Sequence, residues 1–145
     1  MQLTRLIYAS TISDTFSVDD IKPIMEAAKK NNPPAGLTGL LYFNRRFFLQ
    51  CIEGSRSEIN LTYNKILKDE RHKDITLLSY QDIIERQFSS WQMGYLPESD
   101  LTQSTYIHFS NKAEFNPYFM SGESAKELIL ELKEILENNK SSNAQ

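Results

Sequence analysis

The order of apolar and polar residues predicts a β-hairpin near the middle of the chain. Two apolar runs, Leu37–Phe43 and Phe47–Ile52, flank a short polar break at Asn44–Arg46, which is the layout of two strands joined by a turn. Gln50 is the one polar side chain of the second run, and the alternation of strand side chains places it on an apolar face. A buried amide without partners costs about 1–3 kcal/mol. We therefore expect Gln50 to have a hydrogen-bonding partner on that face.

Three other segments have the composition of strands. Leu3–Ser10 is rich in β-branched and aromatic residues, and both of its faces are expected to be largely buried. Ile75–Tyr80 and Trp91–Leu96 follow later in the chain. Within the last segment, Trp91 and Met93 share a face because they are two residues apart.

The first expected helix lies between the first two strands. Its apolar residues recur at helical spacing after the capping candidates Asp19 and Asp20. The helix must end at Asn32, because Pro33 disfavours a helical conformation in the residue before it. Asn31 and Asn32 continue its inward-facing stripe, so both amides are expected to reach the edge of the core. On composition alone, the simpler interpretation of the Asn-Asn-Pro-Pro run is a helix stop.

Two more helices are expected in the second half of the chain. Ser55–Glu58 forms a capping box, and an apolar stripe follows it to about Asp69. The last helix is expected within Ser121–Asn138, where the apolar residues form an amphipathic stripe. Asp100–Met120 has weak periodicity and is expected to be irregular or a short helix, and Asn139–Gln145 is expected to be a frayed tail.

The order of these elements is strand, helix, strand, strand, helix, strand, strand. It predicts an α+β fold, a ferredoxin-like sandwich in which a five-stranded mixed sheet carries two helices on one face. Ile7, Leu49 and Cys51 would then point to the opposite face. The C-terminal helix is the candidate to cover that second face.

Composition narrows the class of protein. The 145 residues carry a net charge of −3 and are 40% hydrophobic, which fits one domain with its own core. No basic run is long enough to bind nucleic acid. The lone Cys51 cannot form an internal disulfide, and the sequence has neither a signal-peptide pattern nor an apolar run of about 20 residues. We expect a cytoplasmic protein that binds neither nucleic acid nor membranes.

Common enzyme motifs are missing from the sequence. It has no phosphate-binding glycine loop, no metal-ligand spacing and no nucleophile elbow, so no metal site is expected. His72 and His108 have polar neighbours and are interpreted as surface or loop residues. Tyr8 and Gln50, however, share the helix-facing side of the expected sheet, where the Asn-Asn end of the first helix would join them. Neutral hydrogen-bonding groups under an apolar roof suit the edge of a flat heterocycle.

At these residues the sequence resembles the BLUF domain family, the blue-light sensors that use flavin. The resemblance covers about Leu3–Pro97 and rests on several spaced motifs: LIYAS, NNPPAGLTGLLYF, FFLQCIEG, ILKDERH and SSWQMGYL. It implies a flavin-binding photosensor domain at residues 1–98. The remaining residues, 99–145, would be an extension with an amphipathic helix at about 122–138, as in the short stand-alone members of the family.

The resemblance also implies roles for single residues. The photoactive tyrosine of the family matches Tyr8, and its switching glutamine matches Gln50. The signalling residues of the last strand match Trp91 and Met93. The residues implied for flavin binding are Tyr8, Ile24, Lys29, Asn31, Asn32, Phe48, Gln50, Ile66 and Arg71, with Lys65 as a further candidate.

The function implied by the resemblance is blue-light reception without enzymatic turnover. The cofactor would be FAD, with FMN or riboflavin as other forms of flavin. Light would drive an electron from Tyr8 to the flavin while a proton passes through Gln50, and the hydrogen bonds of Gln50 would then rearrange. We expect a homo-oligomer, at least a dimer, that binds or releases a protein partner on illumination, with Asp100–Met120 as the contact region.

Two other functions fit the expected fold. A small hydrolase similar to acylphosphatases would hold an anion with Arg71 or Arg5, although its phosphate-binding loop is not visible in the sequence. A colourless regulatory module that binds a ligand or a protein is the other alternative. Colour distinguishes them, because a blue-light sensor is yellow when purified and its absorption shifts reversibly to the red under blue light.

Overall fold

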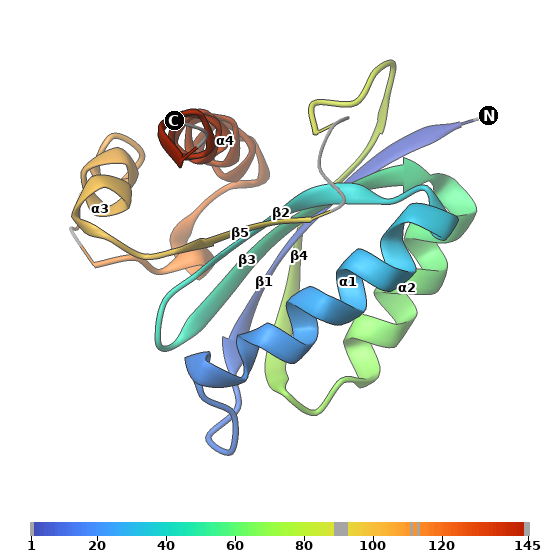
Figure 1. Ribbon diagram of the computed structural model, residues 1–145, viewed down its shortest axis with the longest axis horizontal. Helices are drawn as coiled ribbons and strands as arrows, with labels where there is room; N and C mark the ends of the chain where they lie inside the picture. Colours follow the sequence, from blue (N-terminus) through green and yellow to red (C-terminus); the bar gives the residue numbers. More distant parts are fainter. Residues whose placement is uncertain (1, 89–92, 111, 113, 144–145) are drawn as a thin grey trace.

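A mixed β-sheet lies at the centre of the computed structural model (Figure 1), which describes residues 2–88, 93–110, 112 and 114–143. Within these residues the sheet has five strands in the order β4-β1-β3-β2-β5. The strands are β1 (Leu3–Ile12), β2 (Thr38–Phe43), β3 (Phe47–Ser55), β4 (His72–Ile83) and β5 (Gly94–Pro97). The pair β2 and β5 is parallel and the other neighbouring pairs are antiparallel. The expected ferredoxin-like fold with a five-stranded mixed sheet is confirmed.

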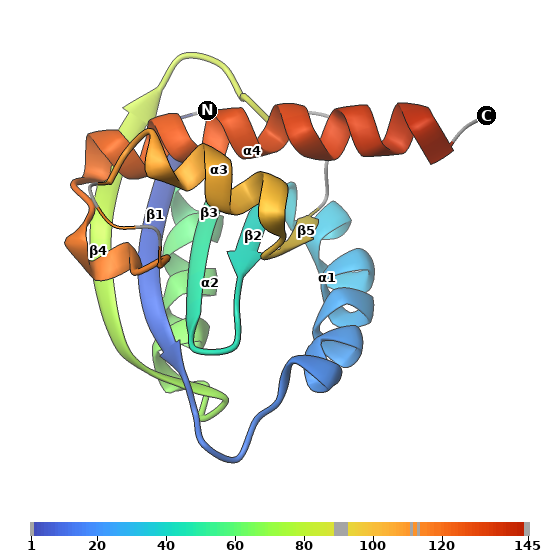
Figure 2. The same cartoon turned by 90° about the vertical axis from the view of Figure 1, so that its left-hand side faces the viewer.

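Helices cover both faces of this sheet. The longer helices are α1 (Ile21–Ala35), α2 (Arg56–Lys68), α3 (Asp100–Ile107) and α4 (Gly122–Asn143), and the short 3-10 helices are η1 (Val18–Asp20) and η2 (Pro117–Phe119). Helices α1 and α2 lie on one face, and α3 and α4 lie on the other (Figure 1). Figure 2 shows α4 running across the sheet, from above β4 to a point beyond β5. The C-terminal helix therefore covers the second face, as expected.

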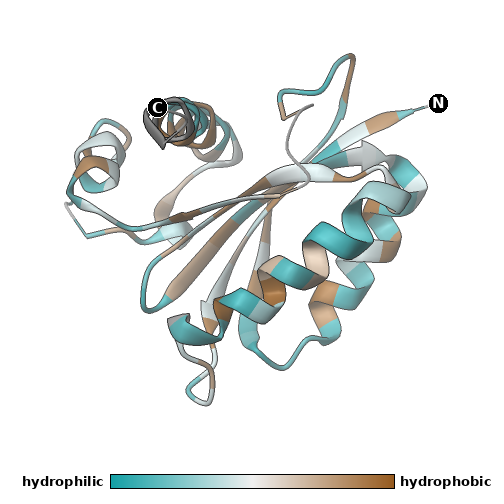
Figure 3. Ribbon diagram, in the orientation of Figure 1, coloured by the Kyte–Doolittle hydropathy of each residue, from teal (hydrophilic) through white to brown (hydrophobic). Residues whose placement is uncertain are grey.

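Strand β3 contributes side chains to the hydrophobic core on both faces of the sheet. Leu49 and Cys51 pack in the cluster under α4, whereas Phe48 and Ile52 pack on the side of α1 and α2. The cluster under α4 receives four fully buried residues from that helix: Ala125, Leu128, Ile129 and Leu132. Figure 3 shows hydrophobic residues along the central strands and hydrophilic residues on the outer surfaces of α1 and α2. The alternation read from the sequence is confirmed.

The expected end of the first helix at Asn32 is wrong, because α1 continues through both prolines to Ala35. Gly36 follows in a left-handed conformation with φ of 67°, which glycine adopts at little cost. The backbone N–H of Gly36 donates to the carbonyl of Pro33 at 3.1 Å, and the next N–H, of Leu37, donates to the carbonyl of Asn32 at 3.0 Å. This Schellman arrangement satisfies the carbonyls of the last turn. It stabilises a helix end in which two prolines lack N–H donors.

The other predicted elements differ from the structure mainly at their ends. The side chain of Ser55 accepts a hydrogen bond from the Glu58 N–H at 3.3 Å and caps α2, as expected. β4 extends beyond the predicted Ile75–Tyr80 because its backbone pairs with β1 over a longer stretch. Many β4 residues are exposed at the sheet edge, so their sequence shows little of the alternation of a half-buried strand. The predicted strand Trp91–Leu96 begins outside the described residues, and β5 starts at Gly94.

The C-terminal segment is more regular than its sequence indicates. Ser99 and Thr102 cap the start of α3 reciprocally, which fits the short helix expected within Asp100–Met120. The expectation of a frayed tail after Asn138 is wrong as far as Asn143, because α4 continues to that residue. Extending an existing helix needs no new nucleation, so a polar run can remain helical. Among the described residues, no helix is long and apolar enough to cross a membrane.

Candidate functional site

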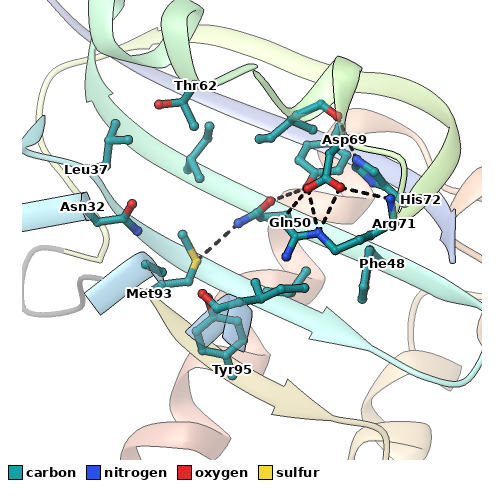
Figure 4. Close-up of a pocket in the computed structure, with 16 residues that line it drawn as sticks. Asn32, Leu37, Phe48, Gln50, Thr62, Asp69, Arg71, His72, Met93 and Tyr95 are labelled. Atoms are coloured by element: carbon teal, nitrogen blue, oxygen red, sulfur yellow. Dashed lines mark hydrogen bonds and ion pairs between the residues drawn. The ribbon is translucent and has the colours of Figure 1, made fainter. Parts of the chain in front are cut away.

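A cavity of about 160 Å³ lies between α1, α2 and the face of the sheet that they cover (Figure 4). Its apolar lining consists of Ile24, Ala28, Leu37, Leu41, Phe48, Ile52, Ile66 and Met93. The residues that bring polar groups are Tyr8, Asn32, Gln50, Thr62, Asp69, Arg71, His72 and Tyr95. In Figure 4, Asn32 lies toward one end of the cavity and Asp69 and Arg71 toward the other, with Gln50 between them.

The first helix forms the roof of this cavity. None of the residues of α1, all of which the structure describes, is fully buried. Ile24 and Ala28 are half-buried and line the cavity. The apolar face of α1 therefore borders the cavity rather than packing tightly on the sheet. The sheet below the cavity contributes both polar side chains, such as Tyr8 and Gln50, and apolar ones, such as Phe48 and Ile52.

Tyr8 and Gln50 meet on the floor of the cavity. They are directly paired residues of the antiparallel strands β1 and β3. The Tyr8 hydroxyl donates a hydrogen bond to Oε1 of Gln50, and Nε2 of Gln50 donates to the sulfur of Met93 at 3.5 Å. The partner expected for Gln50 is thus Tyr8 on one side and Met93 on the other.

Burial extends the pH range over which the phenol of Tyr8 stays neutral. Only 3% of Tyr8 is exposed, and desolvation raises the pKa of its hydroxyl well above the ordinary value of 10.0. The negative charge of Asp69 raises this pKa further, and Arg71 opposes the shift. A neutral phenol can donate a proton in a hydrogen bond, which the phenolate cannot do.

A charged pair lies at the other end of the cavity. The Arg71 Nε donates to the two carboxylate oxygens of Asp69 at 2.9 and 3.0 Å. This hydrogen bonding lowers the pKa of Asp69 and raises that of Arg71. The sequence indicated Arg71 as a candidate anion binder but did not identify Asp69. The Asp-x-Arg spacing after the second helix was the available signal.

His72 contradicts its interpretation as a surface or loop residue. It is the first residue of β4 and is only 8% exposed. Its Nε2 donates to the backbone carbonyl of Ile66 at 2.8 Å, and its Nδ1 lies 2.8 Å from the Ser10 hydroxyl. Its ring is inclined at 65° to that of Tyr8, with centroids 6.0 Å apart. The burial of His72 could not be predicted from its polar sequence neighbours. It arises because β4 directs the side chain inward.

The structure brings most of the predicted site residues together. Those that line the cavity are Tyr8, Ile24, Asn32, Phe48, Gln50, Ile66, Arg71 and Met93. Lys29, Asn31 and Lys65 are exposed and are not part of the lining, so the expectation that Asn31 faces inward is wrong. Trp91 lies outside the described residues. The flavin-binding and signalling roles of all these residues stay predictions.

The shape and chemistry of the cavity fit a flat heteroaromatic ring. Aliphatic side chains suit the faces of such a ring, while the amides of Asn32 and Gln50 present both donors and acceptors to its edge. The guanidinium of Arg71 suits a carbonyl edge. The described residues include no group of three or more His, Cys, Asp or Glu side chains that could hold a metal ion. The isoalloxazine ring of a flavin therefore fits the residues present.

Comparison with known proteins gives a consistent result. A family model described as BLUF, sensors of blue-light using FAD, matches residues 3–94. The blue light- and temperature-regulated antirepressor BluF of Escherichia coli K12 is 37% identical over 76 residues, which are 52% of this chain and 19% of that protein. The chain spans about a fifth or less of the curated relatives that it matches.

Two solved structures are similar over most of their length. The photo-activated state of BlsA is 29% identical with a TM-score of 0.82, over 90% of this chain and 94% of that one. The dark-state structure of BlrB is 31% identical with a TM-score of 0.69, over 74% of this chain and 81% of that one. These similarities confirm the expected fold.

The family match settles the expectations drawn from the resemblance at their general level. The cofactor of the family is a flavin, FAD by the description of the model. The model describes its members as sensors of blue light, so the expectation of a photosensor domain is confirmed. Because the family model matches well over half of the residues, this chain belongs to the BLUF family of blue-light sensors that use FAD.

Proposed function

We propose that this chain is a blue-light photoreceptor in which Tyr8 and Gln50 form the photochemical switch. The observation that supports the proposal is the hydrogen-bond chain from the Tyr8 hydroxyl through the Gln50 amide to the sulfur of Met93. All three of these hydrogen-bonded side chains line the cavity that fits a flavin ring. Asn32 and Arg71 would hold the ring edges, and apolar side chains of α1, α2 and β3 would contact its faces.

A bound flavin excited by blue light supplies a strong oxidant. Tyr8 is the electron donor, because its phenol is neutral, buried and in the cavity wall. As Tyr8 loses an electron, its hydroxyl proton moves along the existing hydrogen bond to the Gln50 amide. The amide would pass a proton from Nε2 on to the bound flavin, which would also take the electron. When an electron and a proton return to Tyr8, its phenol is unchanged, and the amide is rotated if both of its protons are again on Nε2, or a tautomer if one stays on Oε1. No residue is permanently altered.

The contact with Met93 makes the two forms of the switch distinguishable. A thioether sulfur accepts hydrogen bonds but cannot donate one. Rotation of the Gln50 amide by half a turn would direct Oε1 at this sulfur and abolish their hydrogen bond, whereas a tautomer would keep an N–H there. A net hydrogen bond is worth about 0.5–1.5 kcal/mol. The output is therefore a modest shift between two populations.

The same proposal assigns different roles to two parts of the chain. Residues 1–98 form the photosensor, and residues 99–145 form the extension that carries the output through a homo-oligomer, at least a dimer, and a light-dependent protein partner. Exposed apolar side chains in the extension support this, since Leu101, Ile107 and Phe119 are 56%, 49% and 69% exposed. Equal sedimentation in light and dark, alone and with candidate partners, would count against this output.

Substitution of the two switch residues tests the photochemistry. The purified protein should be yellow, and its absorption should shift reversibly to the red under blue light. Tyr8→Phe and Gln50→Leu should retain flavin and lose the shift completely, because each removes one end of the hydrogen bond between them. Tyr63→Phe is the matched control, since its ring lies near that of Tyr8 but the hydroxyl does not contact Gln50.

Absorption spectra before and after illumination decide the result. Retention of the red shift in either switch variant contradicts the mechanism. Loss of the shift in Tyr63→Phe would show that any change near the ring has this effect, and would also count against the specific roles of Tyr8 and Gln50. A colourless protein that takes up no added FAD would overturn the assignment as a photoreceptor.

A further inference from the structure

A buried ion pair joins β1 and β3 on the face covered by α4. Arg5 and Glu53 are directly opposite each other in the sheet, and the Arg5 Nε donates to Oε2 of Glu53 at 3.0 Å. The Glu53 side chain is fully buried, and 8% of the Arg5 side chain is exposed. Buried charges are costly unless their hydrogen bonds are satisfied. The second carboxylate oxygen of Glu53 must therefore also have partners.

Those partners belong to the segment between β4 and β5. The backbone N–H groups of Gln87 and Phe88 donate to Oε1 of Glu53 at 2.8 and 3.0 Å. Phe88 is fully buried in the cluster under α4, and the ammonium of Lys133 lies 5.8 Å from the centre of its ring. Glu53 thus fastens this segment to the sheet at the point where its aromatic side chain enters the core.

Arg86 of the same segment binds the turn that joins α1 to β2. Its Nη1 donates to the Thr38 hydroxyl at 2.9 Å and to the backbone carbonyl of Glu53 at 3.1 Å. Its Nη2 donates to the backbone carbonyl of Gly36 at 2.7 Å. One planar guanidinium therefore binds the turn after α1, the start of β2 and the middle strand β3, which a flexible ammonium cannot reproduce.

The turn that Arg86 holds is part of the roof of the cavity. Gly36 and Leu37 form the Schellman cap of α1, and the carbonyl of Asn32 accepts one of its hydrogen bonds. Asn32 and Leu37 both line the cavity. Since α1 contributes no fully buried residue of its own, the contacts at its ends carry much of its positioning. Arg86 supplies such a contact without touching the cavity.

We propose that Arg86 is a positioning residue of the flavin site. It sets the place of the α1 end, and with it Asn32, over the sheet. Through the shared attachment to Glu53, the same residue joins this roof to the core under α4. The expected effect of Arg86 on FAD binding rests on the proposed flavin function. Its effect on the turn between α1 and β2 does not depend on flavin.

The test compares Arg86→Gln, Arg86→Lys and the control Arg56→Gln in the full chain. The control Arg56→Gln removes the same positive charge, but from an exposed ion pair with Asp82 that does not contact α1. Arg86→Gln should raise the dissociation constant for FAD and the amide exchange rate of Gly36 and Leu37 by about tenfold each, as expected for losing charged hydrogen bonds. Arg86→Lys should lie between the wild type and Arg86→Gln.

Urea unfolding of each variant separates positioning from general stability. The proposal requires that the dissociation constant for FAD and the amide exchange rates of Gly36 and Leu37 change in Arg86→Gln. Both must stay unchanged in Arg56→Gln when the two variants unfold at similar urea concentrations. Wild-type values in Arg86→Gln, or equal changes in both variants, would overturn it. If the wild type takes up no FAD, the proposed function fails, and the exchange rates of Gly36 and Leu37 still decide the role of Arg86.

Discussion

Burial keeps the tyrosines of the cavity neutral far into the alkaline range. Desolvation raises the pKa of Tyr8 and also raises that of Tyr95 to about 12, so both remain phenols at pH values where an exposed tyrosine ionises. The charge at the polar end is carried by Asp69 and Arg71, which compensate each other. A neutral donor beside a neutral amide suits the transfer of an electron and a proton together, since it leaves little net charge in the buried wall.

Buried tyrosines also make alkaline stability a test of the structure. Burial raises the pKa of Tyr42 to about 12, while an unfolded tyrosine ionises near 10. The stability that this group contributes is complete below about pH 10 and is lost as the pH rises toward 12, at up to roughly 1.4 kcal/mol per pH unit. Tyr42→Phe should therefore make the free energy of unfolding less sensitive to pH above 10.

Urea unfolding at pH 9, 10 and 11 measures this slope. Tyr80→Phe is the matched control, because Tyr80 lies on the edge strand and is 43% exposed. This control should keep the wild-type slope. The same slope in Tyr42→Phe and in the wild type would contradict the burial of the Tyr42 hydroxyl.

The sequence predicted single residues well where the alternation of strands decides their place. Gln50 and Tyr8 follow from that rule, because both lie in the middle of apolar strands. Asp69 and His72 do not, since they lie at the end of a helix and the start of an edge strand, in a polar stretch of sequence. The burial of His72 depends on the pairing of β4 with β1, which no local pattern indicates.

At the scale of elements, the short helix η2 connects the C-terminal extension to the sheet. The Tyr118 hydroxyl donates to the backbone carbonyl of Asp74 at 2.9 Å and, having used its one proton, accepts from the Thr11 hydroxyl at 2.7 Å. Asp74 has a positive φ of 54°, near a register irregularity between β1 and β4. Tyr118 thus holds the strand end that begins with the buried His72.

Removal of the Tyr118 hydroxyl should loosen this connection. Tyr118→Phe keeps the ring packing and loses both hydrogen bonds, so we expect a loss of stability of about 1–2 kcal/mol. Urea unfolding measures the loss, and amide exchange should increase at Lys73–Thr76. Phe119→Leu is the control, because Phe119 is 69% exposed and should change neither measurement. Unchanged exchange at Lys73–Thr76 in Tyr118→Phe would refute the role of this contact.

The types and order of elements could be predicted, but several of their ends could not. Apolar periodicity indicated α1, α2 and α4, whereas α3 lies in a stretch of weak periodicity. The end of α1 is instead decided by the left-handed Gly36, whose hydrogen bonds prevail over the local preference imposed by Pro33. The length of β4 is decided by pairing with β1. Such contacts join residues far apart in sequence, so a local pattern does not contain them.

At the scale of the whole molecule, the sheet separates the cavity from the extension. Gln50 faces the cavity, while its neighbours Leu49 and Cys51 face the core under α4. A change at Gln50 therefore has to cross only its own strand, β3, to reach the second face of the sheet. Helix α4 is in contact with that core through residues fully buried beneath it. The docking of α4 onto the sheet is therefore the contact at which the proposed output can be tested separately from the proposed photochemistry.

The start of α4 is held by a close approach of two backbones. A Cβ atom on Gly122 would lie 2.2 Å from the backbone carbonyl oxygen of Leu78 on β4, a distance at which one element must move. Gly122→Ala should displace the start of α4 and destabilise the protein by about 1–3 kcal/mol, the usual cost of overpacking. The cavity lies on the other face, so the flavin red shift should be retained.

Absorption spectra and urea unfolding measure these two effects on the same samples. Glu123→Ala is the matched control. Glu123 is the next residue of the same helix and is exposed, and both variants place an alanine methyl group at the start of α4. Stability equal to that of Glu123→Ala would show that α4 does not dock as described. Loss of the red shift in a folded Gly122→Ala protein would show that the two faces of the sheet are not separable, because the photochemistry would then need α4 in place.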